Sequence, residues 1–231
     1  MTDEEAKAIQ EVSKATQTGL DLLKSTGESF RSIFGESLQQ FGGVVADWAT
    51  YYRFKNFWKI MDKVDSLLAD RQVAGKRAAF LPAFALPILD AASLESEEEV
   101  QLLWAGLLTN ALDPTRKLNL KKIYVEILRG MQTLDAMILA SLSVSGLENA
   151  HGLPTGLPLN AIVLAERVSA DVEDVQISLQ TLARYGCVID SWENTIDGLD
   201  TGYAGFRVNN PRSNFRLSHL GGQLVKATSI I

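Results

Sequence analysis

The chain has 231 residues, a formal net charge of −6, and 46% hydrophobic and 22% charged residues, which suits one large globular domain or two small ones. The acidic balance disfavours broad binding to nucleic acid or anionic lipid, because both reward lysine and arginine. The single cysteine excludes an internal disulfide, and neither a secretion signal nor an apolar run of the roughly 20 residues that span a bilayer is visible, so we expect a cytoplasmic protein.

Residues 1–46 are expected to form a helical arm. A weak apolar stripe runs through residues 3–24, and a stronger one follows from Phe30 at helical spacing. Four of its side chains are our candidates for an assembly or membrane surface: Phe34, Phe41, Val45 and Trp48. Membrane-surface helices usually carry several lysines and arginines, whereas this one carries only Arg31. Packing on the bundle or on a second copy is therefore favoured, and direct membrane action is the alternative.

Residues 47–148 are expected to form a helical bundle, because apolar residues recur at three- and four-residue steps without a strand pattern. The predicted helices cover, in order, residues 47–70, a short segment that ends near Ala92, residues 96–112, residues 119–129 and a segment that begins at Thr133. Pro87 is expected in the first turn of the short segment, where proline is favoured.

The helix over residues 96–112 has the strongest signal. Ser96 is a candidate N-cap with Glu99 three residues later, as in a capping box, and Asp113-Pro114 ends the pattern. Three tryptophans recur among leucines at helical spacing and are expected in the core rather than against a ligand: Trp48, Trp58 and Trp104.

The C-terminal part has a different character. Residues 149–157 are rich in glycine and proline and are expected to be a linker. The sequence then predicts a helix over residues 158–168, a helix from Asp171 to Tyr185 with Ser169 as N-cap and Gly186 as C-cap, strands after Cys187, at 206–209 and at 215–217, and a last helix from Ser218. This order over residues 158–231 is typical of a small α+β winged-helix domain, which SLQTLARYGCVIDS (178–191) and FRLSHLGGQLVKA (215–227) also resemble.

Catalytic chemistry has little support in the sequence. His151, His219 and Cys187 have no partners at metal-ligand spacing, and no nucleophile elbow, phosphate-binding loop or zincin motif is present. The acids of residues 97–99 are expected to form a solvated first helical turn, which the helix dipole favours. We therefore expect no enzymatic activity, no cofactor, no metal ion and no small-molecule substrate.

Arg53 and Asn56 are candidates for a polar contact, since they lie three residues apart among aromatic residues. One interpretation is a half-buried arginine paired with a nearby acid. The other is contact with a ligand or partner.

Nucleic-acid binding has four candidate residues: Arg184, Arg207, Arg212 and Arg216. The predicted recognition helix over residues 171–185, however, carries three acids and one arginine, a net charge of −2. Phosphate neutralisation supplies most non-specific affinity for DNA, so we expect a protein-contact module, with DNA binding as the alternative.

Three segments resemble the abortive infection alpha (Abi-alpha) family: RFKNFWKIMDK (53–63), LPAFALPILDAASLESEEEVQLLWAGLLTNAL (81–112) and YVEILRGMQTLDAMIL (124–139). The resemblance extends from about Asp47 to Leu142, and the winged-helix-like tail is also similar to the family. It implies a role in bacterial defence against phage, in which the infected cell dies or stops growing, but it implies no particular reaction.

The sequence therefore predicts a mainly α protein, with an N-terminal helical arm, a helical bundle and a small winged-helix domain. The first functional hypothesis is a non-enzymatic phage-defence protein that acts through protein contacts or self-assembly, as a homo-oligomer or beside a protein partner. The alternatives are a membrane-disrupting effector that uses the arm, and a DNA-binding regulator.

Overall fold

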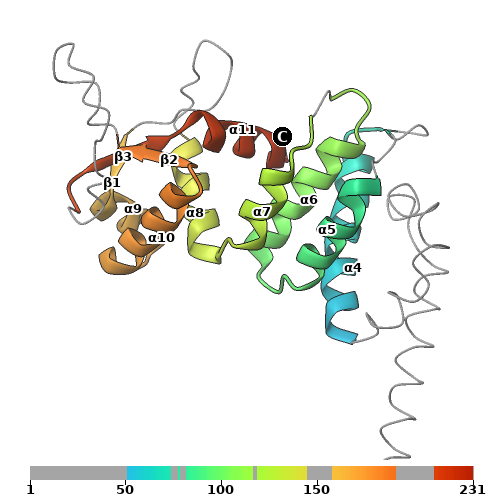
Figure 1. The fold of residues 1–231 in the computed structure, drawn as a ribbon, viewed down its shortest axis with the longest axis horizontal. Coiled ribbons are helices and arrows are strands. Elements are labelled where there is room, and N and C mark those ends of the chain that lie inside the picture. Colours follow the sequence, from blue (N-terminus) through green and yellow to red (C-terminus); the bar gives the residue numbers. More distant parts are fainter. Residues whose placement is uncertain are drawn as a thin grey trace, which may run out of the picture. The chain divides into compact units, whose positions relative to one another are not determined.

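The computed structural model describes residues 51–73, 78, 82–116, 119–144, 158–190 and 211–230, and every structural statement below refers to these residues. They form eight helices and one small three-stranded sheet, so the predicted mainly α fold is confirmed (Figure 1). The predicted arm and linker lie outside the described residues, and so do five of the predicted site residues: Phe34, Phe41, Val45, Trp48, which was also expected in the core, and Arg207.

The chain divides into two compact units, residues 1–129 with 230–231 and residues 130–229. The first unit contains α4 (Tyr51–Asp70), α5 (Pro82–Ser93), α6 (Glu98–Leu112) and α7 (Lys122–Arg129). Helix α6 packs against α4 and α7, and α5 packs against the same two helices.

Trp104 lies at the centre of the first unit and is fully buried, as the sequence predicts. Each fully buried large apolar side chain contributes roughly 1.5–3 kcal/mol. The largest buried side chains of this unit include Ile60, Leu68, Ile88, Trp104, Leu107, Leu108, Leu112, Tyr124, Ile127 and Leu128. The Trp104 Nε1–H has no hydrogen-bond partner within the described part of the chain, so its apolar contacts must outweigh the cost of burying that donor. The prediction that Trp58 lies in the core is only partly right, because its side chain is half-buried.

Two local predictions for this unit are wrong. Helix α6 begins at Glu98 after an extended Glu97 that makes no side-chain cap bond, and the Ser96 hydroxyl donates instead to Glu97 Oε1 at 3.2 Å. The acids of the first turn already interact favourably with the helix dipole, so the helix can form without a capping box. Pro87 lies inside α5, and Pro82 occupies the first helical position, where its missing N–H costs nothing.

The second unit contains α8 (Thr133–Ser143), β1 (Leu159–Asn160), α9 (Ala161–Val168), α10 (Val172–Arg184), β2 (Val188–Asp190), β3 (Asn214–Leu217) and α11 (His219–Thr228). The antiparallel sheet has the order β1-β3-β2, with Leu159 opposite Phe215 and Val188 opposite Leu217. Phe215 and Leu217 are buried on the side of β3 that faces the core.

Helix α8 belongs to the second unit, whereas the sequence grouped it with the bundle. It packs against α9, α10, α11 and β3, which cover its buried residues Ile138, Leu139 and Leu142. Periodicity in the sequence shows that α8 has an apolar face, but it does not show which helices cover that face.

In the second unit, some helix boundaries differ from the predicted ones. The predicted helix over residues 158–168 is preceded by the short strand β1, and Asn160 Oδ1 caps it by accepting the Val163 N–H at 3.0 Å. Ser169 ends α9 in a left-handed conformation (φ 54°) instead of capping α10, whose N-cap is Asp171. Gly186 has φ 72° directly after α10, so the predicted C-cap glycine is confirmed.

Helix α11 begins in close contact with the turn that precedes β2. Ser218 caps α11, as predicted, by accepting the Gly221 N–H at 2.9 Å. The Ser218 N–H donates to the Cys187 carbonyl at 2.9 Å, and the Ser218 hydroxyl donates to the Gly186 carbonyl. A Cβ atom on Gly221 would lie 2.0 Å from the Cys187 carbonyl oxygen, so only glycine fits at this position.

We expect Gly221→Ala to destabilise the second unit by about 1–3 kcal/mol, since a backbone carbonyl must move to make room. Cys187 is the single cysteine of the chain and is fully buried, so the rate at which a thiol reagent labels it reports opening of this unit. Labelling under native conditions should become about tenfold faster or more. The exposed Lys226→Ala on the same helix is the control and should leave the rate unchanged. Equal rates for both variants would contradict the prediction.

Candidate functional site

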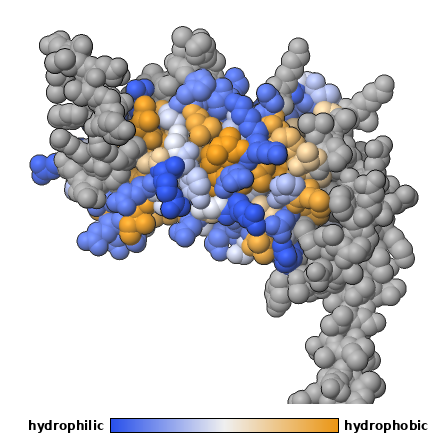
Figure 2. Space-filling model, viewed as in Figure 1, coloured by the Kyte–Doolittle hydropathy of each residue, from blue (hydrophilic) through white to orange (hydrophobic). Residues whose placement is uncertain are grey.

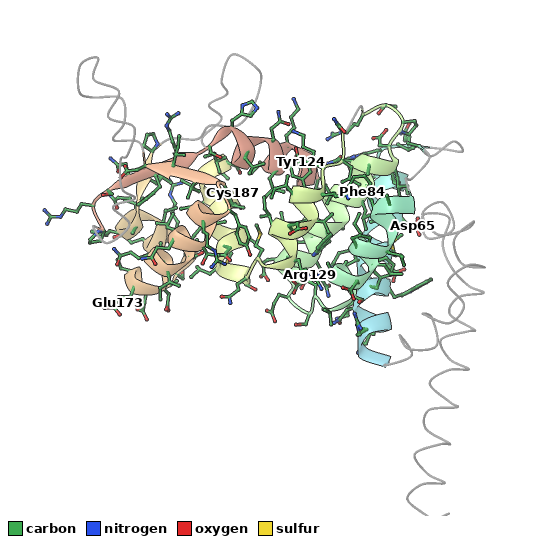
Figure 3. All side chains as sticks on the ribbon, in the orientation of Figure 1. Asp65, Phe84, Tyr124, Arg129, Glu173 and Cys187 are labelled. Atoms are coloured by element: carbon green, nitrogen blue, oxygen red, sulfur yellow. The ribbon has the colours of Figure 1, made fainter. Side chains whose placement is uncertain are left out.

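Arg53, Asp90 and Arg129 form an ion-pair cluster that joins three helices of the first unit. Arg53 Nη2 donates to Asp90 Oδ1 at 2.8 Å, and Arg129 Nη2 donates to Asp90 Oδ2 at 2.9 Å. Arg53 Nε also donates to the buried Ser93 hydroxyl at 3.3 Å. One carboxylate thus holds α4, α5 and α7 together (Figure 3 labels Arg129).

In the structure Arg53 is half-buried and pairs with an acid, Asp90, as the first of its two interpretations expects. The bonds of this cluster do not involve Asn56, which lies one turn further along α4 and is half-buried. The side chain of Asp90 is 45% exposed and that of Arg129 is 59% exposed, so solvent screens the second pair more than the first, in which Arg53 is 28% exposed. The effect of these bonds is to fix the positions of α4, α5 and α7.

A second polar cluster fixes the end of α6. Asp113 accepts the Thr115 N–H at 2.9 Å and the Thr115 hydroxyl at 2.6 Å, and Arg71 Nη1 lies 3.6 Å from its other oxygen. Burial opposes ionisation of Asp113, but the Thr115 hydrogen bonds together with Arg71 and Arg116 outweigh burial and hold its pKa below the ordinary value. Arg71 Nη1 also donates to Asn110 Oδ1 at 2.8 Å, so this cluster joins α4 to the end of α6.

In the second unit a buried carboxylate joins α8 to α10. The Ser178 hydroxyl donates to Asp135 Oδ1, and the Gln132 N–H donates to Asp135 Oδ2 at 2.9 Å. Burial raises the pKa of Asp135 and outweighs these two hydrogen bonds, which lower it. An acid with a raised folded-state pKa reduces stability as pH rises above its ordinary value of 3.8.

Cys187 lies in the same interior and is not poised for chemistry. Burial, together with the charge of Asp135, raises the pKa of its thiol to about 12. A thiol is a nucleophile only as the thiolate, so Cys187 is inert near neutral pH. His219 is exposed at the start of α11, with its Nε2 3.5 Å from Gln223 Nε2. No group of three or more His, Cys, Asp or Glu side chains in the described ranges is placed to hold a metal ion.

Helix α10 presents an exposed side, which we call the α10 outer face, made of Glu173, Asp174, Ile177, Gln180 and Arg184. These positions recur at three- and four-residue steps and lie opposite the buried residues Val175, Ser178, Leu179 and Leu182. Ile177 is 62% exposed and is the one large apolar side chain among the five residues of this face. Figure 3 labels Glu173 at one end of this helix.

Exposed apolar side chains are scattered in both units, and on the face that Figure 2 shows hydrophobic residues lie among hydrophilic ones. The most exposed of the described large apolar residues are Leu94 at 56%, Ile177 at 62% and Val144 at 77%. Of these three, only Ile177 lies inside a helix, since Leu94 follows α5 and Val144 follows α8.

The predicted nucleic-acid residues lie on different elements. Arg184 ends α10, with its guanidinium 5.6 Å from the centre of the Tyr185 ring. Arg216 is half-buried on β3 opposite Ile189, and Arg212 is exposed just before that strand.

Sequence reasoning missed Asp90, Asp135 and Ser178. Asp135 had a readable signal, since it occupies the third position of a capping box whose N-cap is Gln132, the residue before the predicted start of the segment at Thr133. Asp90 had no such signal, because its two partners come from helices distant in sequence.

We expect Asp90→Asn to reduce the free energy of unfolding by about 1–2 kcal/mol, since two charge-assisted bonds are weakened at a half-exposed site. Glu98→Gln is the matched control: it removes the Lys63–Glu98 pair, in which Glu98 is 75% exposed, and should cost less than about 0.5 kcal/mol. Urea unfolding followed by circular dichroism measures both. Similar small losses would show that Asp90 does not hold the three helices.

We expect Ser178→Ala to cost about 1–3 kcal/mol near pH 7 and less near pH 4. The Ser178 hydrogen bond lowers the pKa of Asp135 and so favours the carboxylate, and its full contribution is present only above that pKa. Urea unfolding at both pH values tests this. Thr181→Ala removes a hydroxyl that donates to the Ile177 carbonyl in the same helix, and its cost should not change with pH. A pH-independent cost for Ser178→Ala would contradict the assignment.

None of the helices within the described ranges is both long enough and apolar enough to cross a bilayer.

Comparison with known proteins gives one match. No curated protein and no solved structure matches the chain. The family model for abortive infection alpha matches residues 56–228, which include most of the segment to Leu142 that carries the resemblance and most of the C-terminal tail that is also similar to the family. Because this match extends over more than half of the sequence, the chain belongs to the abortive infection alpha family.

Proposed function

We propose that this protein defends bacteria against phage by abortive infection and acts through protein contacts, without an enzymatic step of its own. Family membership is the observation that carries the proposal. The absence of a reaction is supported by the polar clusters, since each joins helices of the fold and Cys187 is held as an inert thiol.

We propose that the second unit is a winged-helix module, with α10 in the position of the recognition helix. The element order α8-β1-α9-α10-β2-β3-α11 supports this, as does the antiparallel strand order β1-β3-β2. In this reading α8 is the first helix of the module and β1 is its first strand.

The α10 outer face favours a protein partner over DNA. A helix that enters the major groove presents basic and amide side chains to phosphates and bases, mainly from its N-terminal part. Here that part carries Glu173 and Asp174, and Ile177 follows one turn later. Two carboxylates facing phosphates would be repelled, whereas an exposed isoleucine suits an apolar protein contact.

DNA binding is the second candidate, because Arg212 and Arg216 adjoin or lie on β3 and Lys226 is exposed on α11. If DNA bound to Arg212, Arg216 and Lys226, α10 would lie outside the DNA groove. Retention on duplex DNA that falls with added salt and is lost in Arg216→Ala would support it.

We expect cells that express the protein with its neighbouring genes to survive phage challenge as a population, and Ile177→Glu to lower protection by tenfold or more. The glutamate places a charge at the centre of the proposed contact without entering the core. Efficiency of plating measures the effect, and the slow labelling of Cys187 verifies folding.

Leu94→Glu is the matched control, since Leu94 is equally apolar and 56% exposed but lies in the first unit. Full protection by Ile177→Glu would remove the α10 outer face from the proposal. A wild-type protein that protects against no phage, with or without its neighbours, would overturn the defence function itself.

A further inference from the structure

Different elements of the second unit carry opposite net charges. Four exposed acids lie on or between α9 and α10, Glu166, Asp171, Glu173 and Asp174, and they outnumber the two exposed arginines of these helices, Arg167 and Arg184, for a net charge of −2. No acidic residue follows Asp200 in the sequence, whereas four cationic residues do: Arg207, Arg212, Arg216 and Lys226. We call residues 211–228, which contain the last three of these, the basic segment.

The two charged regions occupy different parts of the unit. Helix α10 packs against α8, α9 and β2, whereas α11 packs against α8 and β3 (Figure 1). Within the basic segment, Arg212 and Lys226 are exposed and Arg216 is half-buried on the central strand. Both regions therefore carry charged side chains that are exposed to solvent, on elements with different packing partners.

We propose that the α10 outer face docks on the basic segment of a second copy of this chain. This inference rests on the proposed protein-contact function and names its partner. Exposed acids meet exposed cations, and Ile177 supplies an apolar centre that the acids surround on one side.

A second copy is favoured over an unrelated partner because one chain supplies both halves of the contact. Each copy carries a net charge of −6, so two copies repel each other unless opposite charges meet locally. The contact joins unlike surfaces, so each copy retains one free α10 outer face and one free basic segment. Such head-to-tail contacts build rings or filaments rather than isolated two-fold dimers.

The test uses the full chain and two charge-reversed variants. Glu173→Lys with Asp174→Lys makes both regions basic, and Arg216→Glu with Lys226→Glu makes both acidic. Light scattering coupled to size-exclusion chromatography should show association of the wild type that weakens at least tenfold between low and high salt. Each variant alone should associate at least tenfold more weakly than the wild type.

Mixing the two variants should restore association, because each then offers the charge that the other lacks. This rescue also distinguishes lost contact from misfolding, since a misfolded variant would not be rescued. A reversal of exposed charges in the first unit, Lys59→Glu with Glu126→Lys, should leave association unchanged.

Two results would overturn the inference. One is a wild type that stays monomeric at every soluble concentration, and the other is self-association that neither reversal affects. Retention on duplex DNA without self-association would assign the basic segment to nucleic acid instead. A wild-type monomer that still protects cells against phage would contradict this inference but not the proposed defence function.

Discussion

The second unit depends on one buried carboxylate. Asp135 accepts one hydrogen bond from the Ser178 hydroxyl on α10 and one from the Gln132 N–H at the start of its own helix. It therefore positions α8 and α10 at the same time. The α10 outer face lies on the side of the helix opposite Ser178, which Asp135 holds in this way. Burial makes the carboxylate costly to ionise, which means that neighbouring apolar contacts must supply the surplus stability.

Amphipathic spacing was enough to predict helices in the right places, including α6 around Trp104 and α10 before Gly186. Helix ends were harder to predict, because Ser96 and Ser169 are good N-cap residues by type, but the Ser96 hydroxyl donates to Glu97 and Ser169 ends α9 in a left-handed conformation. The grouping of α8 was missed for a different reason: an apolar stripe shows that a helix is covered, and only tertiary structure shows by what. Asp90 was invisible for the same reason, since its arginines are brought to it by the fold.

The two units hold their helices together by different means. In the first unit, arginines that are partly exposed bridge Asp90 near the surface, and Trp104, whose N–H has no partner among the described residues, fills the centre. In the second, close backbone contact between α11 and the turn at Cys187 leaves no room for a side chain. Loss of a half-exposed charge is therefore easier to accommodate than a side chain at Gly221.

The burial of Cys187 has a consequence for how the protein behaves during cellular stress. Oxidants attack the thiolate and need access to it, and here burial keeps the sulfur protonated and out of reach. The chain has no second cysteine with which a sulfenic acid could condense. While the second unit stays folded, Cys187 is therefore protected from oxidation.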